Sequence, residues 1–544
     1  MTEPVSAPKT ATQTKANIKT KGKARAPAAT TGAEMLSCIN PATGEVLGQV
    51  PAVSPEQVQL AVARARLAQK AWACSSFAQR RRVLEHLLRS VLERTDEICE
   101  SVVQSSGKTW ENALLGEVMT VCAKLRWVID NGERHLKSEK VGSGILPHKR
   151  GRIDYVPLGV VACIVPWNYP FQNIFGSVAA PLMAGNAVII KPSEAVAWSS
   201  ALFQSLLDEA LQSEGFSADT VQIVDGAGAT GAALVRAGVQ KILFIGSAGN
   251  GRRIIEGSAQ TLTPVIMELG GKDPFIVCDD ADLDQALHAA LGGCFINLGQ
   301  NCVASERLIV QAPVYDAFIE KVTAATRALR QGVPTGPGTQ DVGAVCTAQQ
   351  MQVIETLVND ALEKGARALA GGKRLPGQGN FFPPTILVDV TPQMRIAREE
   401  VFGPVMLIFK VADDAEAIAL ANSTEFGLQA SVITRDRARG QRLAAQLESG
   451  GVCINDFGMC YLNQDLPFGG VKASGFGAMN GRDGLRAYTC ARAVLEDRFG
   501  FSVLPKIYPV KPGDYAKAKG MIRLLFGRGL AQKARALRQL IKPQ

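Results

Sequence analysis

The chain has 544 residues, of which 47% are hydrophobic and 20% are charged, which is typical of a globular protein long enough for two or more folding units. Its net charge of +9 comes from the two ends, since residues 1–33 carry +5, residues 505–544 carry +9, and the body between them carries −5. A mildly acidic body gives no reason to expect nucleic acid as a partner, and no apolar run is long enough to span a membrane.

Cysteine and histidine usage indicates a reduced compartment. The twelve cysteines show neither CxxC spacing nor a compact disulfide framework, and the four histidines are isolated from one another. We therefore expect a cytoplasmic protein with free thiols and no metal site.

The N-terminal residues 1–35 are rich in Lys, Thr, Ala and Pro and contain almost no large apolar side chain. Such a segment cannot bury a core, so we predict a disordered basic tail, without the apolar run of a secretory signal. Residues 53–104 have apolar residues at three- and four-residue intervals after a Ser-Pro start at Ser54, which predicts helices.

From about residue 152, short apolar runs alternate with helix-compatible stretches. Strands that are apolar on both faces and separated by helices predict a buried, doubly wound parallel sheet, with strands at 159–167, 186–191, 220–224, 241–246 and 264–269. A second series predicts a second α/β domain after residue 275, with strands at 306–310, 385–390, 405–410 and 429–434 and helices at 350–366 and 436–448.

Residues 501–544 form a basic extension with an amphipathic helical pattern. Apolar residues at 521, 522, 525, 526, 530, 534, 537 and 541 trace one side of a helix, and Lys and Arg occupy the other side. Gly527 and Gly529 should break this helix. The pattern fits peripheral contact with an anionic membrane, docking on a partner, or packing against the protein's own body.

Two glycine-rich loops each follow a predicted strand and open a predicted helix. The segment DGAGATG at 225–231 has the GxGxxG spacing of a dinucleotide-binding turn, but no acidic residue closes a second strand about twenty positions later. The segment FIGSAGNG at 244–251 places Ser247 and backbone N–H groups at a helix start, where a pyrophosphate could bind. The pattern does not choose between these two loops.

Two further loops carry polar residues at predicted strand ends, where open α/β sheets bind ligands. In VPWNYP at 165–170, Asn168 has a neutral amide that can donate to a developing oxyanion. In KPSE at 191–194, Lys191 and Glu194 are a donor and an acceptor suited to ribose hydroxyls. Each segment is also typical of an ordinary turn.

A carboxyl and a thiol complete the candidate residues. Glu268 ends an apolar strand in MELGGKD, where burial should raise its pKa toward the range of a general base. Cys302 lies in LGQNCVASERLIV, just before a predicted strand. A cysteine is more often a small buried hydrophobe than a nucleophile, so its surroundings must decide.

Taken in chain order, these motifs resemble the aldehyde dehydrogenase superfamily, over roughly residues 36–500. Further matches are EEVFGPV at 399–405 and LPFGGVKASGFG at 466–477, and the set is most similar to the plant family-22 type. The resemblance implies a Rossmann-type NAD-binding domain, an α/β catalytic domain and a small oligomerisation arm. The NAD-binding domain is expected at residues 36–137 and 155–268, and the catalytic domain at residues 269–480. The oligomerisation arm is expected at residues 138–154 and 481–500.

The resemblance also implies a mechanism. Cys302 attacks the aldehyde carbon, the Asn168 amide and the Cys302 N–H stabilise the oxyanion of the thiohemiacetal, and Glu268 activates the water that hydrolyses the thioester. Glu194 favours NAD over NADP, because a carboxylate at the ribose repels a 2′-phosphate. The family's phosphate loop is FIGSAGNG, which would make DGAGATG a decoy. The expected cofactor-binding residues are Pro166, Trp167, Lys191, Glu194, Gly228, Gly246, Ser247, Gly270, Glu400 and Phe402.

The substrate is expected to enter through a tunnel with aromatic walls, which suits a medium or long aliphatic or an aromatic aldehyde. Because Asp456 and Asp465 could bind a cationic amine, an amino-aldehyde remains an alternative substrate. A homodimer or homotetramer is implied. The alternatives are a catalytically retired scaffold and a CoA-acylating enzyme, and the presence of Asn168, Glu268 and Cys302 disfavours both. The expected tunnel residues are Tyr169, Phe171, Asn173, Phe175, Phe457 and Tyr461.

Overall fold

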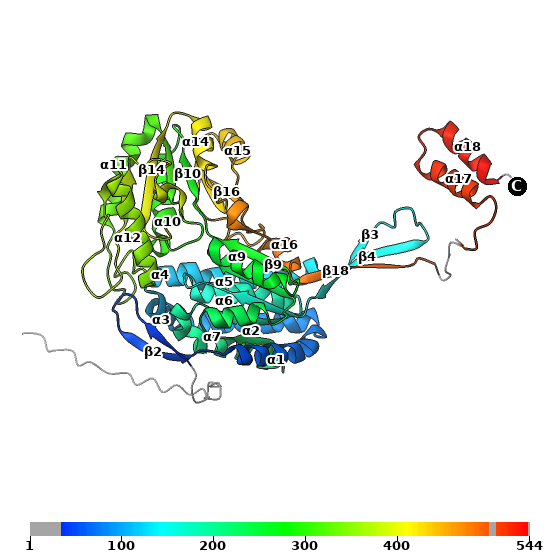
Figure 1. Ribbon diagram of the computed structural model, residues 1–544, viewed down its shortest axis with the longest axis horizontal. Helices are drawn as coiled ribbons and strands as arrows, with labels where there is room; N and C mark the ends of the chain where they lie inside the picture. Colours follow the sequence, from blue (N-terminus) through cyan, green and yellow to red (C-terminus); the bar gives the residue numbers. More distant parts are fainter. Residues whose placement is uncertain (1–33, 500–507, 542–544) are drawn as a thin grey trace, which may run out of the picture.

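The computed structural model describes residues 34–499 and 508–541, so nearly all of the predicted N-terminal tail lies outside the described residues. Figure 1 shows two α/β lobes packed against each other, an arm of strands that projects from them, and a pair of helices beyond the arm. The expected α/β class is confirmed, since each lobe is built around a mainly parallel sheet.

The first sheet has six strands in the order β17-β9-β8-β5-β6-β7. Its five parallel strands follow the order 3-2-1-4-5 of a Rossmann-type half, so the strand order reverses between β5 and β8. The strands are β5 (Val160–Ile164), β6 (Ala187–Lys191), β7 (Val221–Ile223), β8 (Lys241–Gly246), β9 (Val265–Leu269) and the antiparallel β17 (Gly475–Phe476).

Helices cover both faces of this sheet, which explains why its strands are apolar throughout. Alternate residues of β5 point to opposite sides, Val161 and Cys163 into one hydrophobic core and Val160 and Ala162 into another. The first core includes α2 (Phe77–Glu93), α3 (Thr95–Ser106), α5 (Thr120–Leu136), α6 (Pro170–Met183) and α7 (Ser200–Gln212). The second includes α1 (Pro55–Ala73), α8 (Gly228–Val235) and α9 (Ala248–Ala259).

The second sheet has seven strands in the order β12-β13-β14-β11-β10-β15-β16, all parallel except β12. They are β10 (Pro274–Val277), β11 (Arg307–Gln311), β12 (Arg367–Ala370), β13 (Thr385–Val388), β14 (Val405–Val411), β15 (Gln429–Ile433) and β16 (Gly451–Ile454). Its helices include α10 (Leu283–Phe295), α11 (Ala312–Ala328), α12 (Ala348–Glu363), α14 (Asp414–Ala421) and α15 (Arg437–Ala444). The strand and helix order matches the pattern expected after residue 275.

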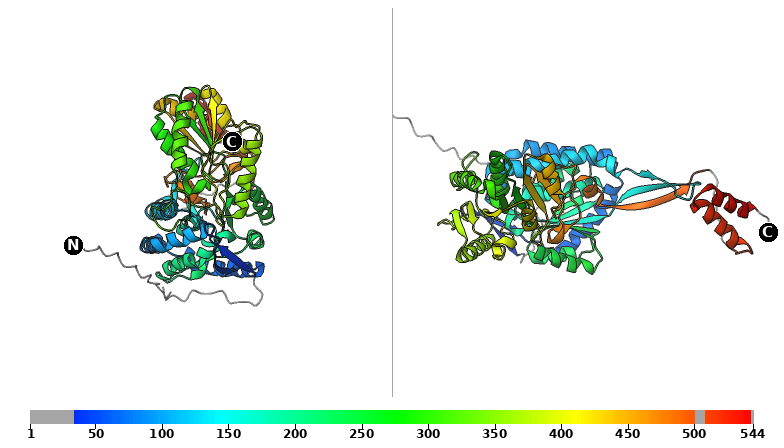
Figure 2. Two further views of the ribbon diagram at one scale, coloured as in Figure 1. Left: turned by 90° about the vertical axis from the view of Figure 1, so that its left-hand side faces the viewer. Right: turned by 90° about the horizontal axis from the view of Figure 1, so that it is seen from above.

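The arm is a three-stranded antiparallel sheet in the order β18-β4-β3 that extends from the body. It consists of β3 (Glu139–Val141), β4 (Lys149–Pro157) and β18 (Thr489–Asp497), and it is seen along its length in Figure 1 and in the right-hand view of Figure 2. The range 481–500 does not begin as a strand, because α16 (Gly481–Arg486) first packs against α5 and α6. The segment β17 crosses from the predicted catalytic range to the first sheet, where it pairs with β9.

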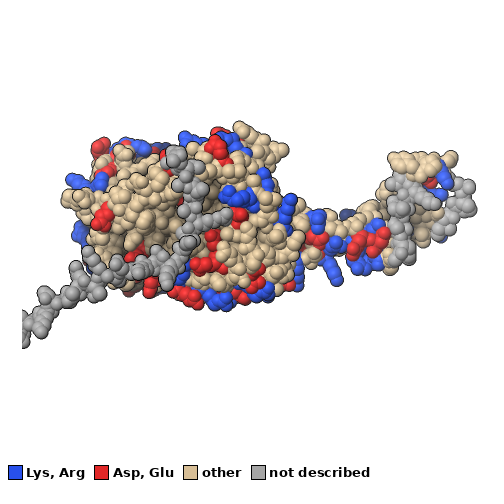
Figure 3. Space-filling view, turned by 90° about the horizontal axis from the view of Figure 1, so that it is seen from below, with Lys and Arg blue, Asp and Glu red and all other residues tan. Residues whose placement is uncertain are grey.

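The remaining elements are short or peripheral. A separate hairpin is formed by β1 (Met35–Ile39) and β2 (Val46–Pro51), and the other helical segments are α4 (Trp110–Ala113), α13 (Arg395–Arg398), α17 (Asp514–Phe526), α18 (Leu530–Ile541), the π-helical η1 (Leu114–Met119), and the 3-10 turns η2 (Glu194–Ser199), η3 (Ala218–Thr220), η4 (Ile296–Gly299) and η5 (Lys472–Ser474). On the face drawn in Figure 3, charges of both signs are mixed over the body. No helix within residues 34–499 and 508–541 is long and apolar enough to cross a bilayer, and those ranges hold no metal-binding cluster of His, Cys, Asp and Glu.

Candidate active site

Most of the candidate residues gather where the two lobes meet. The loops after β5, β6 and β8 leave the carboxyl edge of the first sheet, and Glu268 lies at the end of β9. Cys302 precedes β11, and Glu400 and Phe402 precede β14, so these groups come from the amino ends of strands in the second sheet. The site therefore lies at the topological switch point of the first sheet and is completed by the second lobe.

The thiol of Cys302 and the carboxyl of Glu268 lie close enough for each to shift the pKa of the other. Burial raises the pKa of Glu268 to about 7, and the nearby thiol opposes this rise. Burial and the nearby Glu268 charge hold the pKa of Cys302 well above its usual range. Within the described residues, Oε1 of Glu268 has no hydrogen-bond partner. A buried carboxyl of this pKa can take a proton from the thiol or from a water near neutral pH.

Asn168 is held rigidly beside this pair. Its Nδ2 donates to the Gln300 carbonyl at 3.2 Å, and its Oδ1 accepts from Nδ2 of Asn173 at 3.1 Å. These two bonds fix which end of the amide is the donor. Since an amide nitrogen has two N–H groups, the second one is available to an oxygen on the substrate.

A buried ion pair, which the sequence did not reveal, supports the Asn168 loop. Nζ of Lys108 lies 2.6 Å from Oε1 of Glu117, and both side chains are fully buried. Lys108 donates to the Asn168 carbonyl at 2.8 Å and lies over the Tyr169 ring, 4.1 Å from its centroid. Oε2 of Glu117 accepts the N–H groups of the first turn of α6 at 2.7 and 2.9 Å. The pair therefore fixes both the loop and the start of the helix.

The turn before Cys302 is also constrained. Asn297 and Leu298 have left-handed backbones, with φ of 51° and 56°. Nδ2 of Asn297 donates to the Asn168 carbonyl at 2.9 Å, and Nε2 of Gln300 donates to the Ala344 carbonyl at 3.2 Å. A strained turn that is tied at several points holds the thiol at a defined position opposite Glu268.

The predicted cofactor residues after β5, β6 and β8 lie along one edge. Nζ of Lys191 is 3.2 Å from Oε2 of Glu194, whose side chain is 49% exposed. Ser247 caps the start of α9, accepting from the Asn250 N–H at 3.4 Å. This end of α9 presents N–H groups and a hydroxyl next to the switch point, which is the geometry that holds a phosphate.

Glu400 and Phe402 close the opposite side. The Trp167 and Phe402 rings contact each other edge to face, with centroids 5.4 Å apart. Glu400 accepts from the Gly271 N–H at 2.9 Å, and burial raises its pKa to about 8. A Cβ at position 270 would lie 2.2 Å from Oε2 of Glu400, so any residue other than glycine would displace this carboxyl.

Gly228 and two of the expected tunnel residues lie apart from the groups above. Gly228 begins α8, which follows the edge strand β7, and Thr230 one turn into this helix donates to the Val53 carbonyl at 2.8 Å. Its role as a cofactor-binding residue stays a prediction. Phe171 is fully buried against Phe175 and Phe203, with ring centroids 4.3 and 5.2 Å away, so these side chains form core rather than a tunnel wall.

Of the other expected tunnel residues, Tyr169 and Tyr461 lie near the thiol. Burial raises the pKa of both hydroxyls, and the charge of Cys302 raises it further, joined at Tyr461 by the charge of Glu268. Gln172, which sequence reasoning missed, forms a short hydrogen bond with the Tyr461 hydroxyl. Gly176, one turn further along the same face of α6, leaves room for this contact, since a Cβ there would lie 3.2 Å from Nε2 of Gln172.

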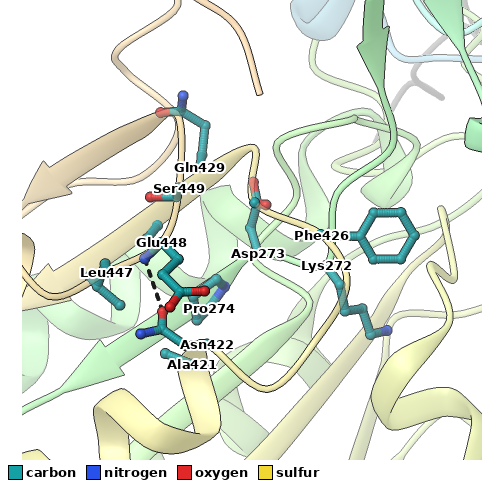
Figure 4. A pocket seen from close by; sticks show the side chains of 12 residues that line it. Lys272, Asp273, Pro274, Ala421, Asn422, Phe426, Gln429, Leu447, Glu448 and Ser449 are labelled. Atoms are coloured by element: carbon teal, nitrogen blue, oxygen red, sulfur yellow. Dashed lines mark hydrogen bonds between the residues drawn. The ribbon is translucent and has the colours of Figure 1, made fainter. Parts of the chain in front are cut away.

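Each of the two candidate acids accepts a hydrogen bond from the protein at one carboxylate oxygen. Oδ1 of Asp465 accepts the Trp127 indole N–H at 2.7 Å, and Oδ1 of Asp456 accepts the Phe457 N–H at 2.8 Å. The Phe457 ring lies against Gly292 of α10. A small pocket beside the start of β10 contains none of the predicted site residues (Figure 4), and its lining includes Lys272, Asp273, Asn422 and Glu448.

The fold and site define an α/β protein with a dinucleotide-type sheet and a cysteine-centred site at its switch point. The sequence matches the aldehyde dehydrogenase family over residues 28–494, and the chain belongs to that family, whose members are oxidoreductases that act on aldehydes.

Three similar proteins illustrate the range of the family. An aldehyde dehydrogenase-like protein of Schizosaccharomyces pombe is 38% identical over 90% of this chain and 95% of its own. The 4,4'-diapolycopene aldehyde oxidase of Methylomonas sp is 35% identical over 93% of this chain and 94% of its own. A crystal structure of an NADP-dependent Escherichia coli enzyme superposes with a TM-score of 0.81 at 36% identity, covering 85% of this chain and 95% of that one.

Proposed function

We propose that this protein oxidises an aldehyde to the carboxylic acid through a covalent bond to Cys302. The observation that carries the proposal is the buried Glu268 carboxyl facing the Cys302 thiol, with the oriented amide of Asn168 beside them. A nucleophile, a base and an oxyanion donor are the three groups that this chemistry requires.

The protein groups act in sequence. Glu268 takes the thiol proton as the Cys302 sulfur attacks the carbonyl carbon, and the Asn168 N–H donates to the oxygen of the thiohemiacetal. A bound nicotinamide dinucleotide supplies the hydride acceptor. Glu268 releases that proton to solvent and then takes one from the water that attacks the thioester. The C–S bond breaks to release the acid, and the Cys302 thiolate regains a proton from Glu268.

The residues at the sheet edge fit a dinucleotide. Ser247 and the first N–H groups of α9 suit its pyrophosphate, and Lys191 with Glu194 suits a ribose. Gly246, Gly270, Glu400, Phe402, Pro166 and Trp167 would surround the rest of the cofactor. We propose NAD rather than NADP because the half-exposed Glu194 carboxylate repels a 2′-phosphate. Equal turnover with both cofactors would contradict this role of Glu194.

The reaction is tested by measuring acid and reduced cofactor formed from an aldehyde, with and without coenzyme A. Hydrolytic oxidation predicts acid in both cases. Acyl-CoA as the product would support a CoA-acylating enzyme, and no turnover would support a retired scaffold. Cys302→Ala should abolish oxidation, whereas the matched Cys122→Ala, at another half-buried thiol, should retain it.

We propose a medium or long aliphatic or an aromatic aldehyde as the substrate. The aromatic side chains of Tyr169, Phe457 and Tyr461 support an apolar tunnel, and both nearby acids have protein partners. The relative named for an apolar polyene aldehyde agrees with this choice. A panel of aldehydes that varies chain length and charge should show kcat/KM rising with chain length; a preference for cationic aldehydes would contradict it.

The arm supports a homodimer or homotetramer. Strand β18 pairs on one side only, so its other edge can pair with a second copy, and Leu495 on it is 54% exposed. Light scattering should report an oligomer for the parent chain and a smaller species for Leu495→Asp. We also propose that the chain is of the plant family-22 type, on the likeness of its motifs alone.

A further inference from the structure

The C-terminal helices form a hairpin that is separate from both lobes. Figures 1 and 2 show α17 and α18 side by side at the far end of the arm. They pack through small residues, since a Cβ on Gly520 would lie 3.2 Å from Leu540, and Ala536 is buried at the same crossing. The helix break expected at Gly527 and Gly529 is confirmed, because these residues form the turn between the helices.

The packing of the hairpin leaves a row of large apolar side chains uncovered. Met521, Ile522, Leu525 and Phe526 are 52%, 56%, 46% and 65% exposed. Their spacing places them on one face of α17, opposite the Gly520 face that meets α18. Leu530 and Leu537 of α18 are likewise exposed. An exposed apolar face of this kind is typical of a docking surface.

The same 34 residues, 508–541, carry a concentrated positive charge, with eight basic residues against the single acid Asp514. All eight basic residues are exposed, and within the described part of the chain none of them forms an ion pair with a carboxylate. They are Lys511, Lys517, Lys519, Arg523, Arg528, Lys533, Arg535 and Arg538.

We propose that this hairpin docks on the surface of an anionic lipid bilayer, with the apolar face of α17 buried between headgroups and the basic side chains against lipid phosphates. Helices of 13 and 12 residues are too short to span a bilayer, which takes about 20 residues, so they lie in the interface. Positive charge spread along both helices matches a continuous anionic surface better than one acidic patch on a folded partner.

The test is flotation of the full-length protein with vesicles of phosphatidylcholine alone and of phosphatidylcholine mixed with phosphatidylglycerol. We expect binding to the anionic vesicles only, and its loss at high salt. Lys519→Gln and Arg523→Gln should each weaken binding about fivefold, the effect of one basic residue near a charged surface.

Phe526→Asp should abolish flotation. The matched control is Leu262→Asp, at an apolar residue of the body that is 88% exposed, and it should bind like the parent. Both variants should keep the solution activity, so a lost activity cannot be mistaken for lost docking. Two results would overturn the proposal: equal recovery with neutral and anionic vesicles, or a Phe526→Asp variant that floats normally. A smaller oligomer in that variant, without any vesicle binding by the parent, would assign the face to a second copy instead.

Discussion

Replacing Glu268 by Gln tests the role of the buried carboxyl. Glutamine keeps the size and hydrogen-bonding shape of the side chain but cannot accept a proton. We expect the steady-state rate to fall by about 10²–10⁴-fold, which is the usual contribution of a general base. The first release of reduced cofactor should slow as well, since Glu268 takes the thiol proton before hydride leaves the thiohemiacetal.

The magnitude of the pH effect follows from burial. A pKa of about 7 means that the buried site disfavours the carboxylate by about 3 kcal/mol relative to water. The base works only when ionised, so the parent rate should rise with pH and level off above that pKa. Between one pH unit below and one above it, the ionised fraction and hence the rate rise about tenfold.

Stopped-flow absorbance of the reduced cofactor separates the burst from the steady state. The matched control is Glu400→Gln, because burial also raises the pKa of Glu400, to about 8. That variant should bind cofactor less well but keep a steady-state midpoint near pH 7. The reasoning is refuted if Glu268→Gln keeps the parent's pH profile, or if Glu400→Gln removes it.

Three further predictions concern contacts around the site. Glu117→Gln should lower kcat about tenfold with little change in KM, because the start of α6 loses a charged acceptor, and thermal melting should show whether the fold is retained. Gly270→Ala should weaken cofactor binding in a fluorescence titration by displacing Glu400, whereas an unchanged Kd would contradict the 2.2 Å approach. Peroxide should convert Cys453 and Cys460, whose Sγ atoms are 3.4 Å apart, to a disulfide and water, and the tryptic peptide 443–472 should then lose two hydrogens. Cys460→Ser should show no such loss.

The sheets could be predicted from sequence because their strands carry strong local signals. The five predicted strands of the first sheet fall within a few residues of β5 to β9, since helices on both faces require apolar side chains at every position. The choice between the two glycine loops could not be made locally. Strand order, in which β8 borders the switch point and β7 is an edge strand, is what favours the loop after β8 as the phosphate site that we propose.

The tunnel residues show where local reasoning fails. Phe171 and Phe175 are aromatic and close to Asn168 in sequence, which suggested a substrate wall. In α6 they lie four residues apart and share the face that packs on Phe203, while Gln172 lies on the neighbouring face with Tyr461. Which side chains of α6 face the core is decided by the elements that pack against this helix. The sequence around Asn168 does not carry that information.

The Lys108–Glu117 pair was hidden for a different reason. Its partners are the Asn168 carbonyl and the first turn of α6, more than fifty residues away in the chain. A buried ion pair contributes little net stability, because the cost of removing both charges from water offsets their attraction. Such a pair is better explained by position than by stability: it ties the Asn168 carbonyl and the α6 N-terminus to one rigid point, which is what the proposed oxyanion contact of the Asn168 amide requires.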